Sequence, residues 1–166
     1  ILHNIGQAVA ILEFTVKENG SRDGYPFQIK ESRFNITGTA DPADLRFVLE
    51  GPGSNNTTGS ISGNVVTFKD FGDIIVTDGD TTGKTYQLKG QIRSSVNGAT
   101  TDGQTIAVSF TPATDIDVVE ASSNILPGNA SMASGAMAIT IVATELQGKN
   151  SFTGLTGLIN QDITGS

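Results

Sequence analysis

The stretch that decides the fold is QAVAILEFTVKE, residues 7–18, where apolar side chains recur at alternate positions. Successive side chains of a β-strand point to opposite faces, so alternation of this kind indicates a strand. One face would carry Val9, Ile11 and Glu13, and the other Ala10, Leu12, Phe14 and Val16. We therefore predict a long strand whose second face is buried.

Similar alternation recurs along the rest of the chain, between turn signals about every 8 to 15 residues. Helix signals are poor, and the best of them is DPADLRF, where Asp41 can cap and Pro42 can start a single helical turn. This pattern predicts an all-β fold. We expect an antiparallel β-sandwich of about eight to ten strands, immunoglobulin-like or related to the jelly roll.

Local irregularities add detail to this expected fold. The alternation in 27–36 shifts near Glu31, which predicts a β-bulge. Gly63 and Asn64 suit a tight hairpin turn, because both tolerate positive φ. The polar tracts 51–60 and 121–135 show no periodicity and are predicted to be surface loops.

The length of 166 residues fits one domain. We expect a β-sandwich module over residues 1–147, followed by a Gly-rich linker or the start of a further module over 148–166. Because the chain begins abruptly inside what resembles the approach to a strand, we expect it to be a piece of a longer protein.

Composition excludes several functions. The net charge of −7 and scattered bases argue against nucleic acid as a partner. No apolar run is long enough to span a bilayer, so membrane insertion is not expected. The sequence contains no Cys, which removes disulfides and thiolate metal sites.

Two loops have the spacing of a calcium-binding loop. Asn19, Ser21 and Asp23 precede a Gly in the first, and Asp78, Asp80 and Thr82 precede a Gly in the second. Alternate oxygen ligands followed by Gly resemble the start of an EF-hand loop. The twelfth position is Lys30 in one and Lys89 in the other, so neither is an EF-hand. Calcium is the only cofactor that these motifs suggest, and hairpin turns in which Asp and Asn bond their own backbone are the alternative.

Catalytic signals are weak. Asp115 and Asp117 are two residues apart on an expected strand and would share a face, as a pair of glycosidase carboxylates must. The chain has no Trp and only two Tyr, which argues against a sugar-binding cleft. His3 is the only His and lies near the terminus. We therefore predict that the chain is not an enzyme and carries no catalytic residues.

The order of several segments resembles a family of known modules. AILEFTVKENGSRDGYPFQI is followed by LRFVLEGP, GNVVTF, IIVTDGDTTGKTYQLKGQI, TDGQTIAVSF and IVATEL. This order is similar to β-sandwich repeat modules of very large secreted or cell-surface proteins of bacteria. The resemblance covers about residues 8–146. It implies an extracellular adhesin-like or structural role in a multidomain chain.

The function expected from these observations is that of a non-enzymatic structural or adhesion module of a large exported bacterial surface protein. Its expected location is extracellular or at the cell surface. Its partners would be neighbouring modules of the same chain and a surface glycan or protein receptor. The alternative is a calcium-dependent or carbohydrate-binding β-sandwich module.

Overall fold

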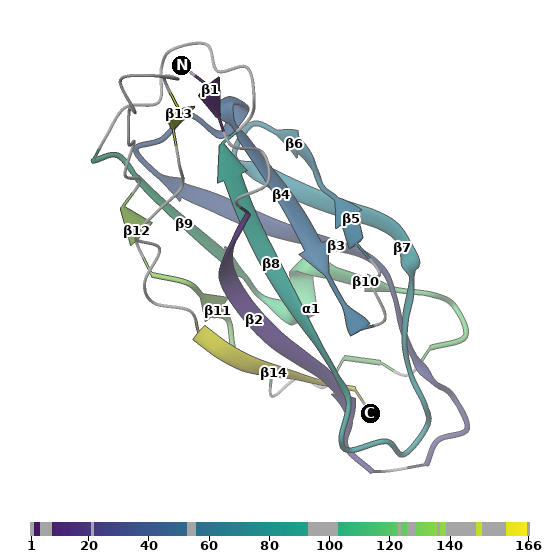
Figure 1. Ribbon diagram of the computed structural model, residues 1–166. Coiled ribbons are helices and arrows are strands. Elements are labelled where there is room, and N and C mark those ends of the chain that lie inside the picture. The colour runs from purple at the N-terminus through teal and green to yellow at the C-terminus, as the bar shows by residue number, and fades with distance from the viewer. Residues whose placement is uncertain are drawn as a thin grey trace.

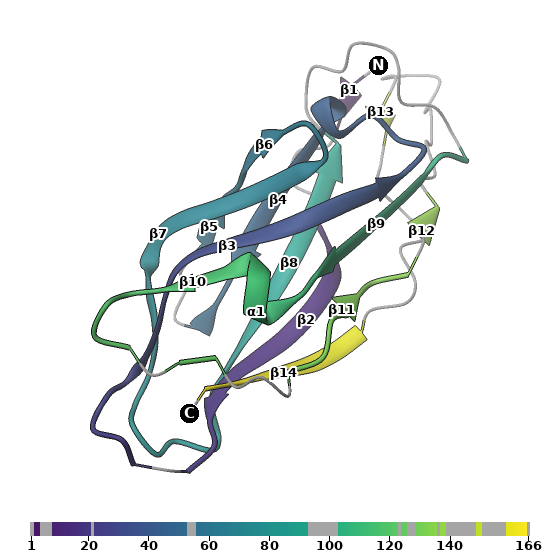
Figure 2. The ribbon, with the colours of Figure 1, turned by 180° about the vertical axis from the view of Figure 1, so that it is seen from behind.

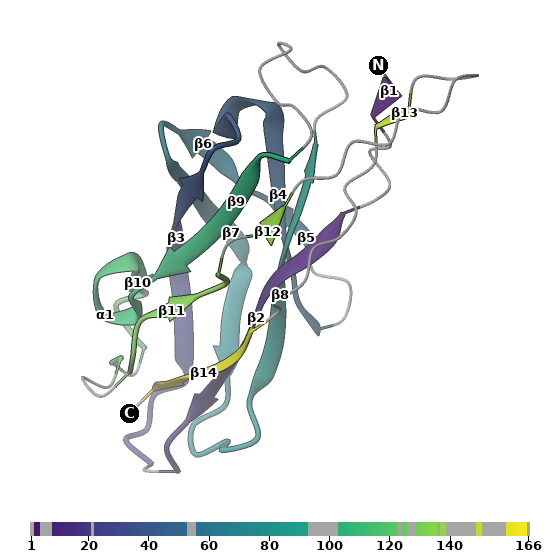
Figure 3. The ribbon, with the colours of Figure 1, turned by 90° about the vertical axis from the view of Figure 1, so that its left-hand side faces the viewer.

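A computed structural model of the chain describes residues 2–3, 8–20, 22–52, 56–92, 103–122, 124–125, 129–135, 137–138, 149–150 and 159–165. It is an all-β fold in which two sheets pack face to face, with β3 and β9 in one layer and β2 and β8 in the other (Figure 3). The predicted antiparallel β-sandwich is therefore confirmed. Neither helix in the described ranges has the length and apolar character needed to cross a membrane.

One sheet has five strands in the order β14–β2–β8–β4–β5 (Figure 1). Its strands are β2 (Val9–Glu18), β4 (Leu45–Glu50), β5 (Asn56–Thr58), β8 (Lys84–Ile92) and β14 (Ile159–Gly165). All neighbours are antiparallel except β14 and β2, which run in parallel.

The other sheet has seven strands, and its path is β11–β9–β3–β7–β6, with β10 against β3 and β12 against β9 (Figure 2). They are β3 (Phe27–Gly38), β6 (Ser60–Ser62), β7 (Val65–Val76), β9 (Thr105–Phe110), β10 (Ile116–Val118), β11 (Met132–Ala133) and β12 (Met137–Ala138). A separate parallel pair joins β1 (Leu2–His3) and β13 (Lys149–Asn150).

Aromatic rings from both sheets form the centre of the core. Phe34 lies 4.7 Å from Phe110, 5.8 Å from Phe68 and 6.1 Å from Phe14, measured between ring centroids. Phe14 also stacks on Tyr86 at 5.9 Å. These separations fall in the range where ring pairs attract each other beyond their burial. The rings of Phe14 and Tyr86 come from the five-stranded sheet, so the cluster joins the two layers.

The strand β2 follows the predicted alternation. Leu12, Phe14 and Val16 are buried, as expected, and Glu18 continues the same face. Ile11, assigned to the opposite face, is also buried, because the pairing with β8 shifts register between Ala10 and Leu12. This irregularity was not predicted.

Three local predictions are confirmed. The pairing of β3 with β7 shifts register between Ile29 and Glu31, where the bulge was expected. Gly63 has φ of 56° in the turn between β6 and β7. A 3-10 helix η1 (Pro42–Asp44) forms one turn, and the Asp41 side chain accepts a hydrogen bond from Ala43 N at 2.9 Å.

The two polar tracts are only partly loops, so that prediction is corrected. The tract 51–60 contains β5 and the first residue of β6, and 121–135 contains β11. Strands of two or three residues are too short to show alternation in the sequence. Their conformation is determined by pairing with β4, β7 and β9.

Strand β14 falls within 148–166, which was expected to be a linker or the start of a further module. It lies at the edge of the five-stranded sheet, beside β2. The boundary between residues 147 and 148 remains a prediction.

Candidate functional site

The two loops with calcium-like spacing lie side by side at one end of the sandwich. The loop between β2 and β3 contacts the loop between β7 and β8. Glu18 N donates a hydrogen bond to Asp80 O at 2.9 Å. A Cβ placed on Gly79 would lie 3.1 Å from Arg22 Nε. This contact between residues so far apart in the chain was not predicted from the sequence.

Within these loops, two of the predicted ligands bond their own backbone. Asp80 Oδ1 accepts hydrogen bonds from Thr82 N at 2.8 Å and Gly83 N at 3.3 Å. Asp23 Oδ1 accepts one from Tyr25 N at 2.8 Å. These are Asx turns, and they agree with the alternative prediction of hairpin turns in which Asp bonds its own backbone.

The other predicted ligands have different environments. Asp78 Oδ1 is buried and has no hydrogen-bond partner in the structure. Asn19 and Thr82 are exposed, and Ser21 lies outside the described residues. Across the described part of the chain, no group of three or more His, Cys, Asp or Glu residues is placed to hold a metal ion. Calcium binding at these loops therefore stays a prediction.

Glu18 lies at the same end of the sandwich but belongs to neither of the two calcium-like motifs. It ends β2 and is only 1% exposed. Its position two residues after Val16 places it on the buried face of the strand, so the alternation itself contained the signal. Burying a carboxylate costs free energy unless the group is hydrogen-bonded or paired with a charge. Glu18 therefore differs in chemistry from Leu12, Phe14 and Val16, the apolar residues before it on the same face.

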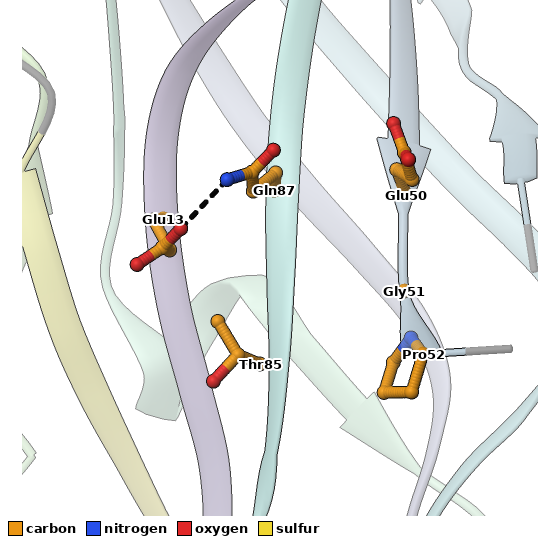
Figure 4. A pocket seen from close by; sticks show the side chains of 6 residues that line it. All are labelled: Glu13, Glu50, Gly51, Pro52, Thr85 and Gln87. Carbon is orange, nitrogen blue, oxygen red and sulfur yellow. Dashed lines mark hydrogen bonds between the residues drawn. The ribbon is translucent and has the colours of Figure 1, made fainter. Parts of the chain in front are cut away.

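A pocket of about 280 Å³ lies on the outer face of the five-stranded sheet. Its lining residues are Glu13, Glu50, Gly51, Pro52, Thr85 and Gln87 (Figure 4). They come from β2, β8, the end of β4 and the residues that follow it. The pocket was not predicted from the sequence, because it depends on the register of three strands.

That register places three polar residues in one row across the sheet. Gln87 of β8 is paired with Glu13 of β2 on one side and with Glu50 of β4 on the other. Gln87 Nε2 donates a hydrogen bond to Glu13 Oε2 at 2.7 Å. Glu50 Oε2 forms an ion pair with Lys89. Two carboxylates thus flank one amide.

Two other lining residues, Thr85 and Gly51, are held in place by contacts with residues next to the pocket. Thr85 Oγ1 and Thr15 Oγ1 share a hydrogen bond at 3.0 Å. A Cβ on Gly51 would collide with the ring of Tyr86, so this position requires Gly. Burial raises the pKa of the Tyr86 phenol to about 12, so the ring beneath the pocket stays neutral.

The carboxylates considered as a glycosidase pair have structural roles. Asp115 lies in the helix α1 (Pro112–Asp115) and Asp117 in β10, so the prediction that both share one strand was wrong. Asp115 Oδ2 accepts a hydrogen bond from Thr111 N at 2.7 Å. Asp117 Oδ2 lies 2.8 Å from Arg33 Nη1. Pro112 starts the helical turn that separates the two acids.

Arg33 is the centre of an ion-pair network on the seven-stranded sheet. Its Nη1 also lies 2.7 Å from Glu31 Oε1, and Lys69 Nζ lies 3.0 Å from Glu31 Oε2. The hydrogen bond from Arg33 lowers the pKa of Asp117 and, together with Lys69, that of Glu31. The network fixes β10 against β3.

Comparison with known proteins places the chain in no family. No protein-family model matches the sequence, and no curated protein matches it. One similar solved structure is described as "AvmM Catalyzes Macrocyclization in Alchivemycin A Biosynthesis". It is 11% identical with a TM-score of 0.36, and the match covers 87% of this chain and 94% of that one. A similarity this distant does not bear on function.

Proposed function

We propose that the chain is a non-enzymatic structural or adhesion module of a large exported bacterial surface protein, joined in series with neighbouring modules. The observation that carries the proposal is the parallel pairing of its first and last long strands. Seven residue pairs, from Leu12 with Ile159 to Glu18 with Gly165, join β2 to β14.

Parallel pairing has a mechanical consequence when the chain is under tension. The chain enters β2 from one end of the sandwich and leaves β14 at the other (Figure 1). Force on the two chain ends therefore pulls β2 and β14 past each other along their length. The hydrogen bonds between parallel strands then share the load and must break together. This geometry suits a spacer that keeps its shape while its neighbours are pulled.

The adhesion part of the proposal is supported by the loop between β2 and β3, which lies at the end of the sandwich where β2 and β14 end. Tyr25 is 52% exposed, and Arg22 belongs to the same loop. Tyr and Arg are the residue types that most often dominate binding interfaces. A surface glycan or protein receptor would meet the module at this end, and an extracellular location follows from that role.

Stretching single molecules by their two chain ends tests the spacer role. Labelling intact source cells with an antibody against this chain tests the location. Labelling only after the cells are broken would contradict the surface role.

A calcium-dependent module is the second candidate. Asp78 Oδ1 favours it, because a buried carboxylate oxygen without a hydrogen-bond partner is a position where a bound ion or water is expected. Comparing the thermal unfolding of the protein in calcium and in chelator separates this candidate from a metal-free spacer.

A further inference from the structure

We propose that the pocket on the outer face of the five-stranded sheet binds a guanidinium group, such as that of an arginine side chain. The proposal is independent of the mechanical role, because the six lining residues named above belong to β2, β4, β8 and the residues that follow β4. It is carried by the row Glu13, Gln87 and Glu50 and by the shape of the pocket.

The row holds two carboxylates with the Gln87 side chain between them. Neighbouring strands are about 4.8 Å apart, so the backbones of Glu13 and Glu50 are separated by about 10 Å. A flat group with donors along several edges can lie across the Gln87 amide and reach both sides. The three side chains belong to regular strands, which hold their positions better than loops do.

Gln87 contributes an acceptor to the pocket. A carboxylate accepts hydrogen bonds but cannot donate one, so the amide must turn its NH₂ group toward Glu13. Its carbonyl oxygen consequently lies on the side away from Glu13, as Figure 4 shows. The pocket thus offers oxygen acceptors from both carboxylates and from the amide.

Among ligands that carry hydrogen-bond donors, the charge of the pocket favours a cation. Glu13 and Glu50 are the two charged residues among the six that line the pocket, none of the six is basic, and Lys89 pairs with Glu50 from outside this lining. A guanidinium carries five N–H donors in one plane, and its faces are weakly hydrated. One face can pack against the Pro52 ring, which borders the pocket. A neutral sugar fits less well, because none of the six lining side chains is aromatic.

The experiment is a titration of the ¹⁵N-labelled protein with N-acetyl-arginine methylamide, followed by NMR at low ionic strength. The matched control ligand is N-acetyl-citrulline methylamide, which has nearly the same shape but no charge. We expect the Gln87 side-chain amide resonances to shift, with a dissociation constant on the order of 1 mM for the arginine ligand. The citrulline ligand should bind at least about fivefold more weakly.

Variants of the protein test the two carboxylates separately. Glu13→Gln and Glu50→Gln should each weaken binding about two- to fivefold, the usual range for an exposed ion pair. Glu120→Gln, an exposed acid outside the pocket, should leave the affinity unchanged. Both pocket substitutions keep the size of the side chain, and unchanged resonances in the core show that the fold is intact.

Equal binding of the arginine and citrulline ligands would overturn the proposal. So would a shift of the same resonances with glucose and none with arginine, which would assign the pocket to a neutral polyol. Either result leaves the role of the β2–β14 pairing unaffected, so the two proposals fail separately.

Discussion

Glu18, the last residue of β2, is paired with Gly165, the last residue of β14. The first and last long strands of the chain therefore run in the same direction and end together. Antiparallel strands dominate the rest of the sandwich, so this parallel edge is the exception in the fold. It is the feature on which the proposed mechanical role rests.

Phe34 is expected to be the most sensitive position of the aromatic core. It contacts three other rings and is fully buried, so Phe34→Ala leaves a cavity between the two sheets. We expect a loss of about 3 to 5 kcal/mol in the free energy of unfolding, measured by urea denaturation. Tyr25→Ala, at an exposed loop position, should cost less than about 0.5 kcal/mol. Equal losses in the two variants would contradict this description of the core.

Gly38 and Gly63 are two positions at which the space for a side chain differs. Both have positive φ, of 120° and 56°. A Cβ on Gly38 would collide with the carbonyl oxygen of Thr105, whereas a Cβ on Gly63 meets nothing within 4 Å. We expect Gly63→Ala to cost about 1 to 2 kcal/mol and Gly38→Ala at least about 3 kcal/mol. Chemical denaturation measures both, and equal costs would contradict the expected collision of a Cβ on Gly38 with Thr105.

The Arg33 network predicts a dependence of stability on acid pH. The pKa values of Glu31 and Asp117 are lowered in the folded protein from ordinary values of 4.5 and 3.8. Their contribution is therefore complete above about pH 5 and is lost as the pH falls through the lowered values.

Asp117→Asn tests this dependence. Because Asp117 is 54% exposed, we expect the variant to lose at most about 1 kcal/mol at pH 7. Its deficit relative to the parent protein should shrink toward pH 2, as followed by urea unfolding at several pH values. A deficit that stays constant over this range would mean that the ion pair does not contribute.

Calcium binding at the two loops predicts a rise in the midpoint of thermal unfolding. A site that binds only the folded state adds about 2.7 kcal/mol at 100 times its dissociation constant. The midpoint of unfolding should then rise in millimolar calcium relative to chelator, and Asp78→Asn should remove the rise. Glu120→Gln is the control for the loss of one acid. An identical midpoint in calcium and chelator would show that the loops are turns only.

Much of the fold follows from the local sequence. The alternation in β2, the bulge near Glu31 and the turn at Gly63 each depend on residues close together in the chain, and each was predicted. The short strands β5 and β11 were missed, because they form only through pairing with distant partners.

The candidate sites depend even more on contacts between distant segments. Gln87 and Glu13 share the pocket only because β8 lies beside β2 in a particular register. A slip of one residue would turn either side chain into the core. The meeting of the two loops with calcium-like spacing likewise results from the packing of the sheets, so the sequence identified each loop but not their contact.

Single-molecule stretching tests the proposed mechanical role most directly, and the lack of Cys makes the attachment points easy to choose. In one molecule, cysteines added beyond both chain ends apply the force along β2 and β14. In a second, Asn19→Cys and the same C-terminal cysteine pull the adjacent ends of β2 and β14 apart, so that residue pairs separate one after another.

We predict that end-to-end stretching requires a clearly higher unfolding force than the second geometry. Substituting proline for both Asp162 and Ile163 should lower the end-to-end force, because one of two consecutive N–H groups must face β2. An end-to-end force equal to or below that of the second geometry would contradict the proposal that the parallel strands bear the load.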